Sequence, residues 1–183
     1  MELIDILDEQ GNYTGRVEER KKVHEQGLWH IHVGVWIMNK KGELLFQKRA
    51  NSTTNPNRWS RTGGHVDTKE TPLQAIQRET EEEIGVKIPE NKFELINIKK
   101  DESYSSDTQI FNRNFIYSYY TLVDYKLEDY KMQKEEVSDL KYITIEEMKN
   151  AKKNKDESYS FIKWDGICEV IEMLESKREK LNK

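Results

Sequence analysis

Residues 64–86 read GHVDTKETPLQAIQRETEEEIGV, and this stretch predicts the best-defined helix of the chain. Thr71 is suited to cap the first turn, Pro72 suits the first helical position, and Gln74 completes a Thr-x-x-Gln capping box. Gly85 is a natural helix stop, because glycine readily adopts the left-handed conformation that ends many helices. The pattern therefore predicts a helix that begins at Pro72 and ends just before Gly85.

Carboxylates gather on one face of this helix. At about 100° per residue, Glu79, Glu82 and Glu83 fall within an arc of about 100°. Like charges at this spacing destabilise a helix by roughly a few tenths of a kcal/mol per pair, so the cluster calls for an explanation. Three carboxylates suit a hard divalent cation, which takes oxygen ligands. Arg78 can hold one of them by a bidentate contact. The adjoining face, which can pack on a sheet, carries Leu73, Ile76, Thr80 and Ile84.

The stretch resembles the Nudix box, Gly-x5-Glu-x7-Arg-Glu-U-x-Glu-Glu-x-Gly-U, in which U is a bulky apolar residue. Its fixed positions are matched by Gly64, Glu70, Arg78, Glu79, Glu82, Glu83 and Gly85. Val86 fits the final apolar position, whereas Thr80 departs from the other one. An opening strand with a DEQG turn, an LWH hairpin, a QKR sequence and a late EEVSDLKYITIEEM extend the resemblance over most of the chain. The whole is similar to the Nudix branch related to isopentenyl-diphosphate isomerase.

This resemblance implies metal-dependent hydrolysis of a diphosphate that is linked to another group, by attack of water on phosphorus. It implies that Glu79, Glu82 and Glu83 bind Mg²⁺ or Mn²⁺, with the carbonyl of Gly63 as a further ligand and Arg78 as a catalytic-site residue beside them. Bound metal neutralises the diphosphate oxygens and lowers the pKa of a bound water. The predicted cofactor is therefore Mg²⁺, with Mn²⁺ as the alternative.

A carboxylate is then expected to remove the proton of the attacking water. In the family this base is either a glutamate of the box or one on a later loop. Glu136, in the sequence KEEVSDL, matches the later position best, and Glu135 is the second choice. Glu70 is expected to brace the loop, directly or through Arg78, and not to contact the substrate.

Five further residues are candidates for substrate binding. Lys48, Arg49 and Arg61 can pair with phosphates, since an acidic metal site needs positive charge around its anionic ligand. Trp59 can stack on a flat group. Gly64 lets the backbone approach the metal or the phosphate closely. A role on the solvated surface remains the alternative for each of the three basic residues.

The isomerase of the same branch needs different residues. Its cysteine, just before a Gly-His pair, corresponds to Gly63, and its two strand glutamates correspond to Asn112 and Asn114. The single cysteine, Cys168, falls in the C-terminal helix pattern, where a buried thiol is expected. These departures favour a hydrolase, with the isomerase and a non-catalytic nucleotide-binding module as the alternatives.

Three histidines fall near the places where the isomerase binds its metal, namely His24, His30 and His65. Two interpretations stay open for them. They are either structural or substrate-contacting histidines, which is the favoured interpretation, or the ligands of a second metal.

The expected fold is α/β (α+β): a Nudix-type α/β/α sandwich with a mixed β-sheet between helices. Residues 30–39 and 43–49 predict a hairpin around a Lys-Lys-Gly turn, and residues 17–24 predict a charged helix. A single domain is expected over residues 1–183, with an N-terminal strand and helix extension at about 1–28.

Composition limits the partners. Lys and Arg total 30 and Asp and Glu total 34, so the net charge of −4 argues against a general nucleic-acid binder. No apolar run approaches the length of a membrane helix. One cysteine and no visible signal peptide predict a cytoplasmic protein. The expected partner is a small-molecule diphosphate, a nucleotide derivative by family frequency, and a homodimer is compatible with this size.

Overall fold

The computed structural model describes residues 2–51, 53, 55–105 and 110–181. The strands are β1 (Leu3–Leu7), β2 (Tyr13–Glu19), β3 (His30–Met38), β4 (Glu43–Arg49), β5 (Trp59–Ser60), β6 (Glu94–Ser105), β7 (Ile110–Leu122) and β8 (Val137–Thr144). The α-helices are α1 (Arg20–Gln26), α2 (Pro72–Ile84), α3 (Ile145–Lys153) and α4 (Ile167–Leu181). Short 3-10 turns lie at η1 (Glu90–Lys92), η2 (Leu127–Asp129) and η3 (Ser160–Lys163).

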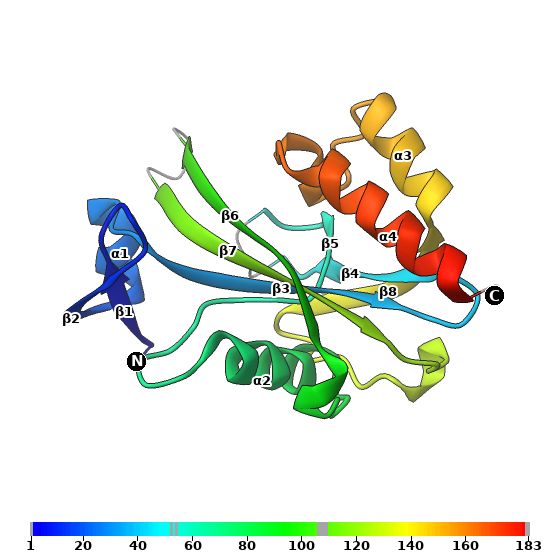
Figure 1. The fold of residues 1–183 in the computed structure, drawn as a ribbon, viewed down its shortest axis with the longest axis horizontal. Helices are drawn as coiled ribbons and strands as arrows, with labels where there is room; N and C mark the ends of the chain where they lie inside the picture. Colours follow the sequence, from blue (N-terminus) through cyan, green and yellow to red (C-terminus); the bar gives the residue numbers. More distant parts are fainter. Residues whose placement is uncertain (1, 52, 54, 106–109, 182–183) are drawn as a thin grey trace.

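The main sheet is mixed, with the strand order β5-β4-β3-β7-β6 and with β8 also paired to β4 (Figure 1). Strands β3 and β7 run parallel, from His30 beside Asn114 to Met38 beside Leu122. The other pairs in this sheet that involve the described residues are antiparallel. The predicted hairpin at residues 30–49 is present as β3 and β4, which pair next to the turn through Met38 and Leu44.

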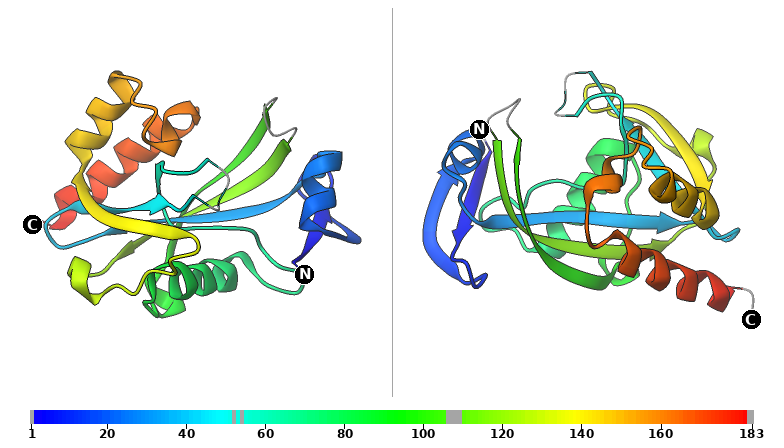
Figure 2. Two further views of the ribbon diagram at one scale, coloured as in Figure 1. Left: turned by 180° about the vertical axis from the view of Figure 1, so that it is seen from behind. Right: turned by 90° about the horizontal axis from the view of Figure 1, so that it is seen from above.

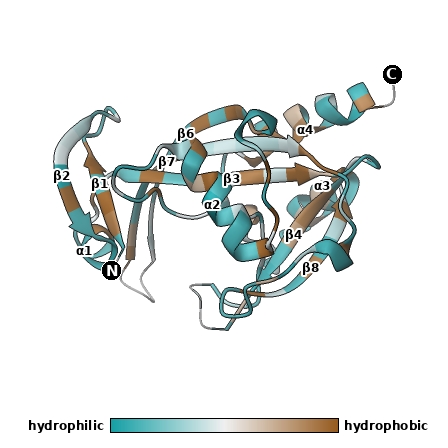
Figure 3. Ribbon diagram, turned by 90° about the horizontal axis from the view of Figure 1, so that it is seen from below, coloured by the Kyte–Doolittle hydropathy of each residue, from teal (hydrophilic) through white to brown (hydrophobic). Residues whose placement is uncertain are grey.

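Helices cover both faces of this sheet, as the views from behind and from above show (Figure 2). Alternate residues of β3 explain the layering, because successive side chains of a strand point to opposite faces. Val33, Val35 and Ile37 belong to the core with α2, whereas Trp36 and Met38 belong to the core with α3 and α4. Because both faces are covered, the second half of β3 is a nearly continuous apolar run (Figure 3). The α/β/α sandwich with a mixed sheet is thereby confirmed.

The N-terminal residues form a separate unit at one end of the sheet, where β1 and β2 make a two-stranded sheet that packs with α1. The predicted helix at residues 17–24 is wrong at its start, since Val17, Glu18 and Glu19 pair with β1 and α1 begins only at Arg20. Charged residues tolerate either structure, and the apolar partner strand decides between them. The core of this unit consists of Ile4, Ile6 and Val23.

Helix α4 covers the face of the main sheet that carries Trp36 and Met38. Its buried residues form a stripe of Ile167, Val170, Ile171 and Leu174. The expectation of a buried Cys168 thiol is wrong, because this side chain is exposed. The Cys168 side chain points about 100° away from that of its neighbour Ile167 around the helix axis, and it therefore lies outside the buried stripe. Across the described residues, no helix combines the length and the apolar character that crossing a membrane requires.

Candidate metal and diphosphate site

Helix α2 begins and ends as its sequence predicts. The hydroxyl of Thr71 accepts a hydrogen bond from the backbone of Gln74, whose side chain accepts one from the backbone of Thr71. Gly85 ends the helix with a left-handed φ of 71°. Thr80, the departure from the apolar pattern, is fully buried, and its hydroxyl donates to the carbonyl oxygen of Ile76 at 2.6 Å. Its polar group is therefore satisfied inside the core.

Arg78 is the centre of a hydrogen-bond network on the solvent side of α2. Its guanidinium donates two bonds of 3.0 Å to the two carboxylate oxygens of Glu70. It also donates to Glu79 at 2.8 Å, to Glu82 at 3.0 Å and to the backbone carbonyl of His65 at 3.0 Å. The predicted bracing of the loop by Glu70 through Arg78 is thus present. One cation holds two of the box carboxylates and the loop that precedes them.

The turn at Gly63 and Gly64 lies directly against the helix. The backbone N–H of Gly63 donates to Glu83 at 3.1 Å, and the carbonyl of Gly64 accepts from the backbone of Val33 at 2.8 Å. A Cβ atom on Gly64 would lie 2.3 Å from a carboxylate oxygen of Glu79. Glycine is therefore required for the carboxylate and the backbone to approach so closely.

Burial dominates the electrostatics of two carboxylates. It raises the pKa of Glu83 to about 8, and the neighbouring Glu79 adds to this rise. Burial likewise raises the pKa of Glu79 to about 7, although the Arg78 guanidinium opposes the rise. At neutral pH the metal-free Glu79 is therefore partly protonated and Glu83 largely so. A bound divalent cation would return both carboxyl groups to the charged form. The residues present therefore fit an oxygen-liganded cation.

Gln47 is a site residue that the sequence prediction missed. It is 2% exposed, accepts a hydrogen bond of 2.9 Å from Thr62, and hydrogen-bonds the carboxyl group of Glu83. It therefore connects β4 to both the turn and the helix. The signal was a glutamine directly after the apolar run LLF of this strand, because a polar side chain that is buried with such a run needs a hydrogen-bond partner.

Two of the predicted site residues, Arg49 and Glu136, interact electrostatically with the carboxyl groups of the box helix. Arg49, at the end of β4, interacts electrostatically with Glu83 and Glu136, while burial lowers the pKa of its guanidinium. Glu136 lies just before β8, is exposed, and its charge acts on both Glu79 and Glu83. The chain thus brings the predicted later-loop glutamate to the box, which the sequence separation alone did not guarantee.

The other basic and aromatic candidates contact each other or the protein. The Arg61 guanidinium lies 5.0 Å from the ring centres of both Trp36 and Trp164, and it donates to the Ser118 hydroxyl at 3.1 Å. Burial lowers its pKa to about 10. The sequence analysis did not predict the contact between Arg61 and Trp164, which comes from the C-terminal part of the chain.

Trp59 is covered by cations from two strands. The ammonium group of Lys141 lies 4.1 Å from its ring centre, and that of Lys48 lies 5.9 Å away. Trp29 and Trp36 are buried in the core.

The three histidines that the sequence left open are brought together. The ligand atoms of His24, His30 and His65 all lie within 4.8 Å of one another. Of the residues that correspond to the isomerase glutamates, Asn114 is buried and Asn112 donates to the Ser103 hydroxyl at 3.4 Å.

The comparison with protein families matches residues 28–165 of this chain to the model of the NUDIX domain. Nudix hydrolase 3 of Arabidopsis thaliana is 36% identical over 163 residues, which are 86% of this chain but only 21% of the plant protein. An uncharacterized Nudix hydrolase of Clostridium acetobutylicum is 33% identical over 159 residues, covering 84% of this chain and 75% of that protein. An isopentenyl-diphosphate Δ-isomerase of Streptomyces avermitilis is 28% identical over 148 residues, covering 80% of this chain and 73% of the enzyme.

Solved structures agree on the fold. A crystal structure of a Deinococcus radiodurans protein superposes with a TM-score of 0.67 at 20% identity, covering 94% of this chain and 99% of that one. The NUDIX domain of NrtR from Shewanella oneidensis, solved with ADP-ribose, gives a TM-score of 0.53 at 19% identity and covers 66% of this chain and 75% of its own. With the box, its cap, the α/β/α layers and relatives above 30% identity in agreement, the chain belongs to the Nudix hydrolase family.

Proposed function

We propose that this protein hydrolyses a diphosphate linked to another group, with a nucleoside diphosphate derivative as the substrate and Mg²⁺, or Mn²⁺, as the cofactor. The observation that carries the proposal is a pair of carboxyl groups on the box helix, the partly buried Glu79 and the buried Glu83, which lie on the same side of the helix against the Gly63–Gly64 turn. The ADP-ribose held by the structurally similar NrtR domain supports the substrate class.

In this proposal Glu79, Glu82, Glu83 and the Gly63 carbonyl hold the metal, which when bound supplies charge neutralisation and an acidified water. Arg78 keeps two of these carboxylates in place, since its single guanidinium contacts both Glu79 and Glu82. The other roles in the reaction, those of the general base and of the cations around the phosphate, fall to other residues of the chain.

Glu136 is the proposed general base. It is exposed to water, and its charge acts on the buried carboxylates. It can therefore take a proton from a water that lies between itself and the phosphorus. Arg49 lies in the field of the same carboxylates and is placed to pair with the phosphate as charge develops on it. Lys48, Arg61 and Trp59 are proposed to line the region that binds the group beyond the diphosphate, and Gly64 gives the phosphate access to the backbone.

Isomerase activity is disfavoured by the fit at Gly63. A Cβ atom at this residue would lie 2.2 Å from the carbonyl oxygen of Val33 and 2.7 Å from the Cα of Gly34. Both are backbone atoms of β3 that cannot move without disturbing the sheet. A cysteine at this position, which the isomerase needs, does not fit this backbone. We further propose a single Nudix domain over residues 1–183 with the extension at about 1–28, acting on small molecules and not on nucleic acid.

The test is product analysis by mass spectrometry on a panel of diphosphate compounds with and without Mg²⁺. The panel includes ADP-ribose and other nucleoside diphosphate derivatives, nucleoside triphosphates and isopentenyl diphosphate. Metal-dependent release of a phosphate or a nucleoside monophosphate from a linked diphosphate is expected. Conversion of isopentenyl to dimethylallyl diphosphate without hydrolysis would show that the protein is an isomerase. Metal-dependent binding of a nucleotide without turnover would favour a non-catalytic nucleotide-binding module. The oligomeric state can be measured on the same sample by light scattering.

Mg²⁺ is expected to bind more tightly as the pH rises. In the metal-free protein, Glu79 and Glu83 have pKa values of about 7 and about 8, so below these values a cation must displace protons. The affinity should therefore increase by at least about tenfold from pH 6 to pH 8 and level off above about pH 9. Titration calorimetry in two buffers of different ionisation enthalpy measures both the affinity and the proton release. An affinity that is independent of pH, with no proton released, would contradict the assignment of these two ligands.

A further inference from the structure

Arg61 is a cation that is surrounded by aromatic rings and backbone. It lies two residues before Gly63 in the chain. Its guanidinium carbon lies 5.0 Å from the ring centres of both Trp36 and Trp164. It also lies against Gly34 of β3, where a Cβ atom would be only 2.2 Å from the Nε atom of Arg61. Glycine inside a strand often marks such a close approach, so the sheet has space for the guanidinium at this position.

No acidic group in the described part of the chain forms an ion pair with Arg61. Its hydrogen bond there runs from Nη1 to the neutral hydroxyl of Ser118, at 3.1 Å. Burial lowers its pKa to about 10, and no carboxylate opposes this effect. Arg78, by contrast, donates to both Glu70 and Glu79. An arginine carries several N–H donors, and most of those of Arg61 have no acceptor among the described residues.

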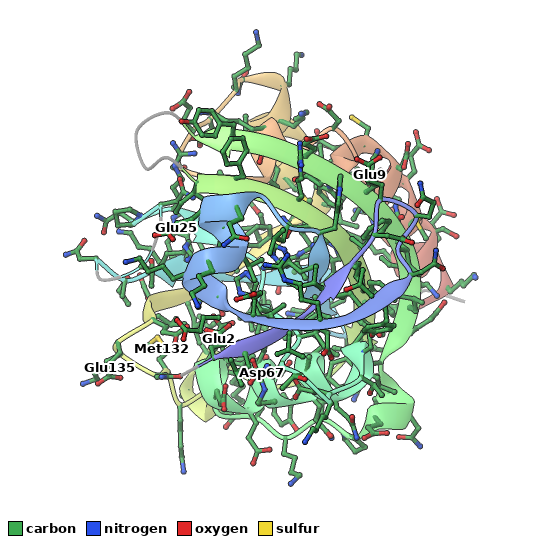
Figure 4. All side chains as sticks on the ribbon, turned by 90° about the vertical axis from the view of Figure 1, so that its left-hand side faces the viewer. Glu2, Glu9, Glu25, Asp67, Met132 and Glu135 are labelled. Carbon is green, nitrogen blue, oxygen red and sulfur yellow. The ribbon has the colours of Figure 1, made fainter. Side chains whose placement is uncertain are left out.

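Acidic residues at the end of the molecule shown in Figure 4 lie beside the box helix. In this view Glu2 and Asp67 lie close together near α2. Burial raises the pKa of Asp67, and the Arg78 guanidinium opposes this rise. The positive charge that acts on this acid is therefore that of Arg78 and not that of Arg61.

The two rings that contact Arg61 also carry donors without acceptors. The indole N–H groups of Trp36 and Trp164 are buried and have no hydrogen-bond partner among the described residues. Contact with aromatic rings stabilises a cation but does not neutralise its charge. A purely structural role explains Arg61 poorly, because an apolar side chain could fill the same space without the cost of an unpaired charge. Part of Arg61 remains accessible to solvent, so an anion can reach it.

Arg61 and its neighbour Thr62 point to opposite faces of the sheet. The Thr62 hydroxyl donates to Gln47, which hydrogen-bonds Glu83 on the face that carries α2. Arg61 instead contacts Trp36, which belongs to the core with α3 and α4. An anion at Arg61 is therefore a different group from the phosphate that a metal beside Glu83 would hold.

We propose that Arg61 binds a second anionic group of the substrate, a phosphate or a carboxylate carried by the moiety beyond the scissile diphosphate. This inference rests on the proposed hydrolase function and narrows its substrates to diphosphates whose linked moiety is itself charged. A guanidinium donates two parallel hydrogen bonds to either kind of anion. Trp36 and Trp164 hold it in place, and Gly34 leaves the space for it. Arg61 thereby determines specificity and takes no part in the hydrolytic step.

The test uses matched substrates that differ by one anionic group. ADP-ribose is compared with its 2′-phosphate, and UDP-glucose with UDP-glucuronic acid, so that the two pairs separate phosphate from carboxylate. With Mg²⁺, the native chain should show a kcat/KM at least about 30-fold higher for the charged member of one pair, mainly through a lower KM. In Arg61→Gln this ratio should fall to about threefold or less, because the charged group loses its partner.

Two further variants separate the charge of Arg61 from its position. Gly34→Ala keeps the arginine, but the new Cβ displaces the flexible end of its side chain, so the preference should be lost as in Arg61→Gln. Arg61→Lys keeps the charge without the planar fork and should keep a preference of about three- to tenfold. Arg113→Gln is the matched control, because Arg113 also lies near a tryptophan, 5.8 Å from the ring centre of Trp29, but is paired with Glu102. Its preference should stay within about twofold of the native value.

A binding measurement needs neither metal nor turnover. Tryptophan fluorescence is titrated with inorganic phosphate and with malonate in EDTA at constant ionic strength, since an anion at Arg61 changes the surroundings of Trp36 and Trp164. A saturable change is expected for the anion that corresponds to the preferred pair. The affinity should be at least about tenfold weaker in Arg61→Gln and unchanged in Arg113→Gln. Far-UV circular dichroism verifies that each variant is folded.

The outcomes separate this inference from the proposed function. Equal losses of kcat/KM for both members of a pair in Arg61→Gln would assign Arg61 to the diphosphate itself and overturn the proposal. A native chain that prefers neither charged substrate, or an anion affinity that is the same in folded Arg61→Gln, would also overturn it. Absence of any cleavage together with an Arg61-dependent anion affinity would contradict the hydrolase function and support anion binding by Arg61.

Discussion

Glu83→Gln is expected to lose about 10³-fold or more in Mg²⁺-dependent hydrolysis while remaining folded. Removing one carboxylate from a metal site removes several kcal/mol of transition-state stabilisation, and about 4 kcal/mol corresponds to this factor. The fold should tolerate the change unusually well, because burial raises the Glu83 pKa to about 8 and the metal-free carboxyl group is therefore largely neutral at pH 7. Glutamine reproduces that neutral group in size and can still accept from Gly63.

The matched control is Glu81→Gln on the same helix. Glu81 is exposed and its carboxylate lies 3.7 Å from the ammonium group of Lys87, away from the site. We expect its activity to stay within about twofold of the native value, since exposed pairs contribute little. Steady-state kinetics across a Mg²⁺ titration and thermal unfolding in EDTA measure both properties. More than a tenth of native activity in Glu83→Gln at saturating Mg²⁺ would remove this residue from the proposed ligand set.

Gly63→Ala is expected to lower the free energy of unfolding by about 2–5 kcal/mol, from steric overlap combined with backbone strain. The added Cβ would lie 2.2 Å from the carbonyl oxygen of Val33, and the φ of 155° is one that residues with a side chain rarely adopt. The flanking hydrogen bonds hold the turn to β3, with Val33 N–H donating to Gly64 and Val35 N–H donating to Thr62. The turn therefore cannot shift without breaking this pairing.

Gly15→Ala provides the comparison for this variant. Gly15 has a φ of 78°, yet nothing lies within 4 Å of the position of its Cβ. Only the left-handed backbone then opposes the substitution, which should cost about 1–2 kcal/mol. Urea denaturation of both variants measures the difference. Equal destabilisation by the two substitutions would show that the overlap at Gly63 relaxes, and would weaken the argument against a cysteine there.

The box helix was predictable because its determinants lie within a few residues of one another. The Thr71–Gln74 capping box, the Gly85 stop and the network of Arg78 with neighbouring glutamates are contacts of short sequence separation. Patterns of this kind fail where local propensity is weak. The charged pattern predicts a helix at Val17, yet this residue pairs with β1 in a strand. The helical pattern predicts a buried Cys168, yet this side chain lies on the exposed side of its helix.

The family, the layers of the fold and the acidic cluster on α2 could be predicted from the amino-acid sequence, because these follow from residue types at fixed local spacing. Which groups are buried and which atoms meet depends on how distant segments pack. Glu83 contacts the Gly63 backbone 20 residues away, and His24 meets His65 across 41 residues. The raised pKa of Glu83 arises because distant segments exclude water from it, and the contact between His24 and His65 arises because distant segments pack together. No local pattern records which segments those are.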